Sequence, residues 1–240
     1  MSKLRSAVGK IQAKLWANMV SVNLDHTTEL LESNKKANFL DLGCNDGLFT
    51  QFCLKTIKTK NIYGVDIDND KVKQAKKLGV KVVKCDLNEA ISFKDNFFDV
   101  VMANQVIEHL YQVDNFISEI YRILKPGGYT IVSTENASSW CNIFASIMGW
   151  QIFSLTNTSS KMWGLGNPLS FYKQVVPHPS ARNHVRIYNI RGLKELFEAY
   201  GFKVEKISGA GYFPLPAFLG NIDPTHCHFM TFKIRKPHKL

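Results

Sequence analysis

Short apolar runs alternate with amphipathic stretches between residues 37 and 134. The runs predict strands, and the stretches between them, with apolar side chains every three or four positions, predict helices. The predicted strands are 37–42, 61–66, 80–85, 97–103 and 128–134, and the predicted helices between them are 47–58, 69–78 and 112–124. Because these strands lack a polar face, we expect an α/β fold in three layers, with helices on both sides of a mostly parallel sheet.

The sharpest boundary in this pattern follows helix 112–124, whose apolar residues fall on one face. Lys125, Pro126, Gly127 and Gly128 come next. Proline cannot continue a helix and glycine allows a sharp reversal, so this segment predicts a helix stop and a turn before strand 128–134.

The pattern differs at the two ends of the chain. Residues 1–34 predict an N-terminal helix, and the alternation breaks at about residue 135. Residues 135–188 are irregular and rich in aromatic side chains, before a helix at 190–200 and strands at 202–208 and 226–235. We expect a single domain over 1–240, with a helical cap over 1–34 and a long insertion after the fifth strand, over 135–188. So long a connection within a compact domain is usually functional.

The stretch FLDLGCNDGLFT, residues 39–50, predicts a ligand-binding turn between a strand and a helix. Gly43 allows the turn, and Gly47 lets the helix begin close to a ligand. Asn45 stands where a third glycine is expected, and asparagine tolerates left-handed backbone angles better than most residues. The turn therefore keeps its shape although one glycine is missing.

Two cofactor classes compete for this turn. A nicotinamide dinucleotide places its pyrophosphate on a helix N-terminus, normally through G-x-G-x-x-G, a spacing that this loop lacks. S-adenosyl-L-methionine carries a sulfonium instead, which favours nearby carboxylates such as Asp41 and Asp46. Asp66, at the end of the second strand, is placed to accept hydrogen bonds from both hydroxyls of a ribose. Asp86, after the third strand, is placed to accept one from an adenine amine.

The motifs DLGCNDG, GVDID, KCDLNEA, FFDVVMANQVIEHL and LKPGG follow one another in an order that resembles class I S-adenosylmethionine-dependent methyltransferases. The sequence looks most like the small-molecule group called methyltransferase type 11, which includes quinone-biosynthesis O-methyltransferases. The resemblance covers 37–134 and resumes at 184–204. It implies a Rossmann-like sheet of seven strands with an antiparallel last strand, and S-adenosyl-L-methionine as the cofactor. Asn45 departs from the family pattern, in which most members have glycine.

The resemblance also implies a set of cofactor-binding residues. They would shape the methionine end of the pocket, hold the ribose, flank the adenine and meet the amino group of the cofactor. They are Asp41, Gly43, Asn45, Asp46, Gly47, Asp66, Ile67, Asp86, Leu87 and Asn104.

Catalysis needs a general base only where the methyl acceptor is a neutral hydroxyl or a protonated amine. His109 and His184 are the candidates, and local packing is the alternative for each. Arg182, Arg186, Tyr188 and Trp140 are candidate substrate contacts, with the arginines suited to an anionic group. No metal site is predicted: THCH, 225–228, would place only His226 and His228 on one face of a strand.

The charge distribution and the cysteine content indicate which class of binding partner and which compartment to expect. Residues 141–240 hold 12 Lys/Arg against 4 Asp/Glu, within a net charge of +10. This excess favours an anionic partner, and no nucleic-acid-binding motif accompanies it. The five cysteines form no C-x-x-C pair, and no apolar run reaches the length of a membrane span, so we expect a cytoplasmic protein with reduced thiols. The uncharged stretch 138–155 is either a lid for a lipid-like acceptor, resting on a membrane surface, or part of a packed core.

Two functions follow from these features. The first is a methyltransferase that acts on an oxygen of a small, lipid-linked or glycan-linked acceptor. The alternative is a non-catalytic module with the same fold that binds a partner protein or senses the cofactor, because LGVKVVKCDLNEA is also similar to a methionine-biosynthesis accessory protein. The sequence fixes neither the acceptor nor the oligomeric state.

Overall fold

The computed structural model describes residues 2–170 and 183–238, and the side chains from residue 13 onward within these ranges. The chain forms two compact units. The larger unit consists of Thr27–Thr134, Leu193–Ile207 and Thr231–Leu240. The smaller unit consists of Met1–His26, Glu135–Gly192 and Ser208–Met230, and so includes the predicted insertion.

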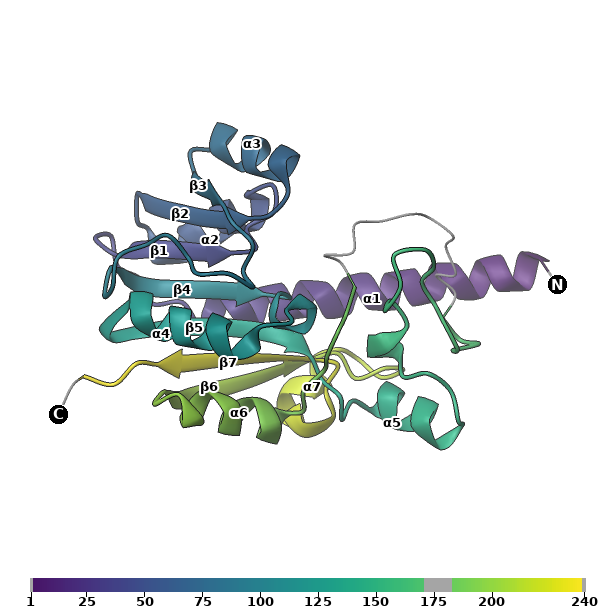
Figure 1. Ribbon diagram of the computed structural model, residues 1–240. Coiled ribbons are helices and arrows are strands. Elements are labelled where there is room, and N and C mark those ends of the chain that lie inside the picture. Colours follow the sequence, from purple (N-terminus) through teal and green to yellow (C-terminus); the bar gives the residue numbers. More distant parts are fainter. Residues whose placement is uncertain (1, 171–182, 239–240) are drawn as a thin grey trace. The chain divides into compact units, whose positions relative to one another are not determined.

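A seven-stranded sheet in the order β3-β2-β1-β4-β5-β7-β6 forms the larger unit, with the ends of β5, β6 and β7 assigned to the smaller (Figure 1). Its strands are β1 (Asn38–Leu42), β2 (Asn61–Asp66), β3 (Lys81–Lys84), β4 (Phe98–Asn104), β5 (Leu124–Glu135), β6 (Lys203–Ala210) and β7 (Phe229–Arg235). The helices are α1 (Ser2–Glu29), α2 (Leu48–Ile57), α3 (Asn69–Lys77), α4 (Val113–Ile123) and α6 (Ile190–Ala199). In Figure 1, α2 lies behind the sheet, and α4 and α6 lie in front of it.

The strand directions agree with the predicted fold class. The strands β1 to β5 pair in parallel along β3-β2-β1-β4-β5. Lys236, directly after β7, accepts a hydrogen bond from Gly127 near the start of β5, whereas Thr231, near the start of β7, bonds to Ser133 near the end of β5. The start of one strand therefore faces the end of the other, and the predicted antiparallel last strand is confirmed.

Both faces of the central strands are buried, as their continuous apolar sequences predict. Phe39, Val100 and Met102 pack in one cluster with side chains of α2 and α3. The neighbouring positions Leu40 and Val101 face the opposite way and are equally buried. Layers of helix on both sides of the sheet follow from this double burial.

The predicted turn at Lys125–Gly128 is instead part of β5. Helix α4 ends at Ile123, as the proline predicts, but β5 begins immediately at Leu124. The pairing with β4 shifts here, from Phe98 opposite Leu124 to Val100 opposite Tyr129. The extra residues form a bulge, with Gly127 at a φ of 79°, so the glycine serves an irregular strand and not a separate turn.

The smaller unit contains more regular structure than its sequence predicts. Helices α5 (Trp140–Ile147) and α7 (Leu219–Ile222) and the 3-10 helix η2 (Phe153–Leu155) form within or after the segment expected to be irregular. A small core of Met19, Ala210, Ala217 and Phe229 supports them. Within the described residues, no helix is both long enough and apolar enough to cross a membrane.

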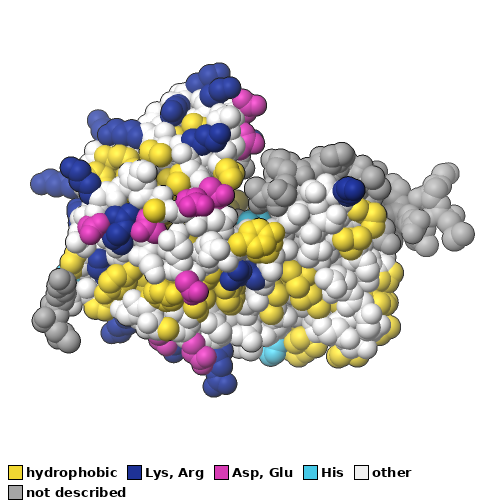
Figure 2. Space-filling model, viewed as in Figure 1, with side chains coloured by type: hydrophobic (Ala, Val, Ile, Leu, Met, Phe, Trp, Pro, Cys, Tyr) yellow, Lys and Arg dark blue, Asp and Glu magenta, His cyan; other side chains and the backbone are white. Residues whose placement is uncertain are grey.

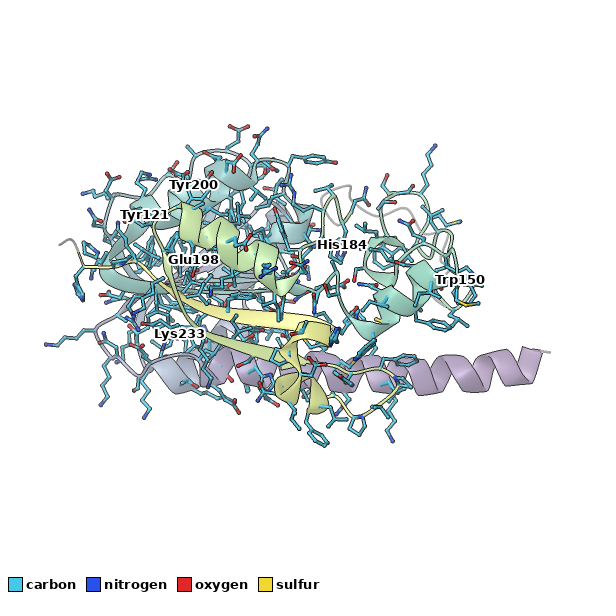
Figure 3. The ribbon with its side chains drawn as sticks, turned by 90° about the horizontal axis from the view of Figure 1, so that it is seen from below. Tyr121, Trp150, His184, Glu198, Tyr200 and Lys233 are labelled. Atoms are coloured by element: carbon cyan, nitrogen blue, oxygen red, sulfur yellow. The ribbon has the colours of Figure 1, made fainter. Side chains whose placement is uncertain are left out.

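Lys236 is a buried cation that ties three parts of the larger unit together. Its Nζ donates to Asn96 Oδ1 at 2.8 Å and to the carbonyl oxygens of Tyr121 and Leu124 at 2.7 Å each. Tyr121 is labelled in Figure 3, where it lies close to Tyr200, the residue after α6. The ammonium group also lies 4.6 Å from the centre of the Tyr121 ring. Its three donors therefore replace the hydration that burial removes.

We expect Lys236→Met to lower the free energy of unfolding by ~3 kcal/mol, because hydrogen bonds to a charged group are lost and two buried carbonyls lose a donor. Urea denaturation of the purified chain measures this difference. Lys73→Met is the matched control, since Lys73 forms only an exposed ion pair with Asp70 and should change stability by less than ~0.5 kcal/mol. Equal effects of the two substitutions would contradict this role of Lys236.

Candidate cofactor site

The loop after β1 has the backbone conformation that its glycines and asparagine predict. Gly43, Asn45 and Gly47 have φ angles of 74°, 49° and 83°. All three lie in the left-handed region, which confirms that Asn45 takes the place of a glycine. The loop thus turns sharply three times between β1 and α2.

Close packing explains why Gly43 and Gly47 cannot carry a side chain. A Cβ on Gly43 would lie 2.7 Å from the Val106 side chain, and one on Gly47 would lie 3.0 Å from Ala75 Cβ. Gly47 immediately precedes α2 and lets that helix begin against α3. Both glycines therefore bring the backbone of the loop close to its neighbours.

The carboxylate of Asp66 joins this loop to the end of β2. Its Oδ2 accepts a hydrogen bond from the backbone N–H of Asn45 at 2.8 Å, and its Oδ1 accepts one from that of Asp68 at 2.9 Å. Each carboxylate oxygen has a second lone pair, so the group can still accept hydrogen bonds from a ligand. Ile67, the next residue, is 46% exposed and offers an apolar side chain beside it.

Three carboxylates surround the start of the loop. Asp41, Asp66 and Asp46 all act electrostatically on the Cys44 thiol, whose pKa burial already raises and these charges raise further. Asp46 also accepts from the backbone N–H of Leu48 at 3.2 Å and pairs with Lys71 at 3.4 Å, so its charge is partly balanced. The resulting negative potential favours a cationic ligand over a pyrophosphate.

The end of β3 is fixed by an asparagine that the sequence analysis did not single out. Asp86 Oδ1 accepts from the backbone N–H and the side-chain amide of Asn88, at 2.9 and 2.8 Å. Asn88 Oδ1 in turn accepts from the backbone N–H groups of Tyr111 and Gln112. The loops after β3 and β4 are therefore bound to each other. Leu87, between Asp86 and Asn88 in the chain, has a buried side chain, so its backbone is the part that can reach a ligand.

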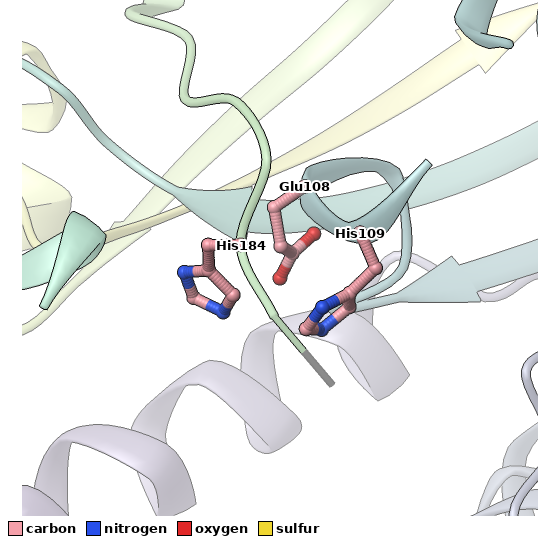
Figure 4. Close-up of side chains that lie close together, drawn as sticks. All are labelled: Glu108, His109 and His184. Carbon is pink, nitrogen blue, oxygen red and sulfur yellow. The ribbon is translucent and has the colours of Figure 1, made fainter. Parts of the chain in front are cut away.

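The chain leaves β4 through a second left-handed residue that no sequence signal indicated. Gln105 follows Asn104 with a φ of 56°, and its N–H donates to Ser133 O at 2.8 Å. The 3-10 helix η1 (Ile107–His109) comes next, and Figure 4 shows the side chains of Glu108 and His109 on it. The buried Glu108 accepts a hydrogen bond from Thr134 at 2.9 Å, which anchors η1 to β5.

The remaining predicted site residues belong to the smaller unit. His184, which is labelled in Figure 3, has its Nδ1 2.7 Å from the carbonyl oxygen of Ser154, and this acceptor places a proton on Nδ1. Arg186 donates to the Tyr188 hydroxyl at 3.4 Å, and Trp140 donates to the Tyr212 hydroxyl at 2.8 Å. Arg182 lies outside the described residues. The structure thus gathers the predicted cofactor residues in one unit and the predicted substrate residues in the other.

The prediction that His226 and His228 share one face of a strand is wrong. His226 closes the 3-10 helix η4 (Pro224–His226), and β7 begins only at Phe229. His226 Nδ1 lies 2.8 Å from Asp223 Oδ2, whereas His228 Nδ1 lies 3.4 Å from Cys141 Sγ. The proline at 224 turns the chain before the strand can form.

Three comparisons place this geometry among known proteins. Ubiquinone biosynthesis O-methyltransferase, mitochondrial, of Rattus norvegicus is 24% identical over 227 residues, which cover 91% of this chain and 59% of that protein. Fatty-acid O-methyltransferase of Mycolicibacterium smegmatis is 29% identical over 117 residues, which cover 47% of this chain and 42% of that protein. The crystal structure of a SAM-dependent methyltransferase from Thermotoga maritima, a possible histamine N-methyltransferase, superposes with a TM-score of 0.62 at 19% identity, covering 98% and 96% of the two chains.

The curated relatives are longer proteins, since this chain spans 59% of the rat enzyme and 49% of its mouse counterpart. A family model for a methyltransferase domain matches residues 15–207, which is most of the chain and includes every residue predicted to bind the cofactor. The fold predicted from the strand-end motifs is confirmed, and with it the class of S-adenosylmethionine-dependent methyltransferases. This chain belongs to the methyltransferase domain family.

Proposed function

We propose that the protein transfers the methyl group of S-adenosyl-L-methionine to an oxygen atom of a small, apolar acceptor. The observation that carries this proposal is the left-handed loop after β1, which the Asp66 carboxylate joins to the end of β2, with Asp41 and Asp46 close by in sequence. A sulfonium cofactor is a cation at its reactive centre and is stabilised by the negative potential of nearby carboxylates. The names of the curated relatives support oxygen as the acceptor atom.

The cofactor would extend along the tips of the first three strands. Asp66 would accept hydrogen bonds from the ribose hydroxyls with its remaining lone pairs, and Ile67 would pack against the adenine. Asp86 and the backbone of Leu87 would meet the adenine edge, since Asn88 holds this loop in place. The left-handed backbone at Asn45 and the exit of β4 at Asn104 would border the methionine end.

The acceptor is proposed from the smaller unit. Helix α5 exposes Phe144 and Ile147, and Met148 directly after it is exposed as well, which suits a lipid-linked molecule or contact with a membrane surface. In the view of Figure 2, charged side chains are sparse over this unit. Residues 141–240 nevertheless carry an excess of Lys and Arg, which suits an anionic acceptor. A glycan-linked acceptor, a cytoplasmic location and membrane contact stay predictions.

Transfer to a hydroxyl requires loss of its proton, and His109 is the proposed base. It stands at the end of η1, which Glu108 anchors to β5. A base held on an anchored element keeps its orientation during the reaction, and general-base catalysis supplies about 10²- to 10⁴-fold in rate. His184 is the second candidate, because a proton on Nδ1 leaves Nε2 as the basic nitrogen.

The charge beneath the cofactor loop depends on Asp41. Its carboxyl group is buried and accepts a hydrogen bond from Thr50 Oγ1 at 2.5 Å. Burial raises the pKa of Asp41 to about 7, with a contribution from the nearby charge of Asp66. Near neutral pH this group therefore changes between a neutral and an anionic form.

The Asp66 assignment predicts a loss of cofactor affinity. Asp66→Ala should raise the Kd for S-adenosyl-L-methionine on the order of 10- to 100-fold, because hydrogen bonds to a carboxylate are lost. Isothermal titration calorimetry measures this change. The matched control is Asp70→Ala, which removes an exposed carboxylate from the neighbouring helix. Unchanged binding in the Asp66 variant would remove the ribose assignment.

The raised pKa of Asp41 predicts a pH-dependent stability. The folded protein keeps this proton up to pH ~7, whereas the unfolded chain releases it near pH ~4. Stability from this group is therefore complete below pH ~4 and falls as the pH rises to ~7, by up to ~4 kcal/mol. Asp41→Asn should gain stability relative to the parent chain as the pH rises from 4.5 to 7.5, which urea unfolding at both pH values measures. Parallel curves for the two proteins would exclude the shift.

Enzymatic turnover separates the proposed methyltransferase from the non-catalytic alternative. With radiolabelled S-adenosyl-L-methionine and a panel of phenolic and fatty-acid acceptors, we expect methyl transfer, reduced ~100-fold in kcat by His109→Gln. His238→Gln, at the exposed end of the chain, is the control. Tight cofactor binding without transfer to any acceptor would favour the non-catalytic module, and full activity of the His109 variant would remove that base.

A further inference from the structure

A cysteine, a histidine and a glutamate form a relay in the smaller unit, apart from the proposed cofactor residues. Cys141 Sγ lies 3.4 Å from His228 Nδ1. On the other side of the imidazole ring, His228 Nε2 lies 3.9 Å from Glu135 Oε1. The two nitrogens of one ring thus face a thiol and a carboxylate, an order in which a histidine takes a proton from a nucleophile while a carboxylate steadies the cation.

Three separate elements bring these side chains together. Cys141 lies in the first turn of α5, Glu135 is the last residue of β5, and His228 directly precedes β7. The imidazole ring is held edge-on by Trp16, with centroids 5.2 Å apart, and by Phe229 at 4.7 Å. Its orientation toward Cys141 is therefore set by packing.

Burial by itself disfavours charge in this relay, so its charged form depends on the contacts among the three groups. His228 is 4% exposed and Glu135 is 7% exposed. His228 Nε2 and Glu135 Oε2 have no hydrogen-bond partner among the described residues. A buried carboxylate without donors requires a compensating positive charge, which an imidazolium supplies. The imidazolium in turn is balanced on its other side by a thiolate.

The pKa directions of the pair agree with this geometry. Burial raises the pKa of the Cys141 thiol, but the charge and hydrogen bond of His228, with a hydrogen bond from Ser139, bring it below its ordinary value. Burial lowers the pKa of His228, but Cys141 and Glu135 outweigh it and raise that pKa to about 9. Cys141, His228 and Glu135 are the charged groups that act on one another here, from α5, the segment before β7, and β5.

The neighbours of Cys141 on α5 are apolar and accessible. Phe144 follows three positions later on the same side of the helix and is 45% exposed, and Met148, directly after α5, is 48% exposed. Cys141 itself is partly exposed. An electrophile that reaches the sulfur would therefore pass over apolar side chains.

From this arrangement we infer that Cys141 is a nucleophilic thiolate, activated by His228 and Glu135, and a covalent modification site for apolar α,β-unsaturated carbonyl compounds. The sulfur adds to the β-carbon of the electrophile and forms an S–C bond. The electron pair of the C=C bond moves to give an enolate, whose α-carbon then takes up a proton. His228 Nδ1 holds that proton in the resting pair and can return it, so the step needs no oxidant or further reactant.

The other cysteines provide an internal comparison. Cys44, Cys53 and Cys227 are buried, and their pKa values are raised, chiefly by burial. Cys85 is partly exposed, like Cys141, but burial and the charges of Asp86 and Glu89 raise its pKa. The two partly exposed thiols thus differ in the direction of their pKa shift, which makes Cys85 the matched reference for reactivity.

The test is the rate at which N-ethylmaleimide labels each cysteine of the full chain, followed by peptide mass spectrometry between pH 6 and 8.5. At pH 6 we expect Cys141 to be labelled at least ~10-fold faster than Cys85, since each unit of pKa changes the thiolate fraction about tenfold. The rate at Cys141 should rise less steeply with pH over this range than the rate at Cys85, because the pKa of Cys141 is lowered and that of Cys85 is raised. Equal rates at pH 6, or no labelling of Cys141, would overturn the inference.

Two variants separate activation from simple exposure. His228→Gln should slow the labelling of Cys141 at pH 6 by ~10-fold and make the labelling rate of Cys141 rise more steeply with pH. The labelling rate of Cys85 should not change. Circular dichroism checks that this variant folds. If it does not, His228→Asn, whose side chain is smaller than the imidazole ring, should give the same direction of change. An unchanged rate at Cys141 in a folded variant would show that the relay does not activate the thiol.

Discussion

The carboxylate of Asp66 is the interaction on which the cofactor site depends. By accepting hydrogen bonds from Asn45 and Asp68, it fixes the loop after β1 to the end of β2. Gly43 and Cys44 also donate to the carbonyl oxygen of Val65 in β2, and Asp66 extends this attachment to Asn45, further along the loop. A single acid thus has a structural role and still has lone pairs for the ligand-binding role proposed for it.

A second constraint acts one strand further along. Asn88 joins the loops after β3 and β4 through Asp86 on one side and Tyr111 and Gln112 on the other. All the strand-end loops of the larger unit that carry candidate cofactor residues are therefore bound to a neighbour. The site is formed by side chains that hold the backbone, and not by a loop that must close on the ligand.

The sequence predicted the larger unit well because its signals are local. The apolar runs predict the strand bounds to within a few residues of those observed. Gly43, Asn45 and Gly47 likewise predict the left-handed turn that the structure shows. Residues that act through distant partners were not predictable in this way. Nothing in the sequence around Gln105 indicates a positive φ. The role of Asn88 follows only from the folded structure, in which Tyr111 lies beside it.

The smaller unit was the least predictable part for the same physical reason. Helix α5 is short and exposes apolar side chains. Its sequence therefore lacks the alternation of polar and apolar faces from which a helix is predicted. Pro224 turns the chain ahead of the predicted strand, so β7 begins only at Phe229 and His226 and His228 do not share a face of it. The relay of Cys141, His228 and Glu135 joins residues that stand up to about ninety positions apart in the chain, and single-sequence patterns do not extend over such distances.

Asparagine at position 45 has a consequence for the energetics of the loop after β1. Glycine explores far more backbone conformations than asparagine when a loop is free, and ordering it costs more entropy. With Asn45 already held at a φ of 49° by the bond to Asp66, less of this disorder is left for a ligand to remove. The departure from the usual glycine thus makes the loop more rigid, and under the proposed function it would give the cofactor a preformed surface to bind.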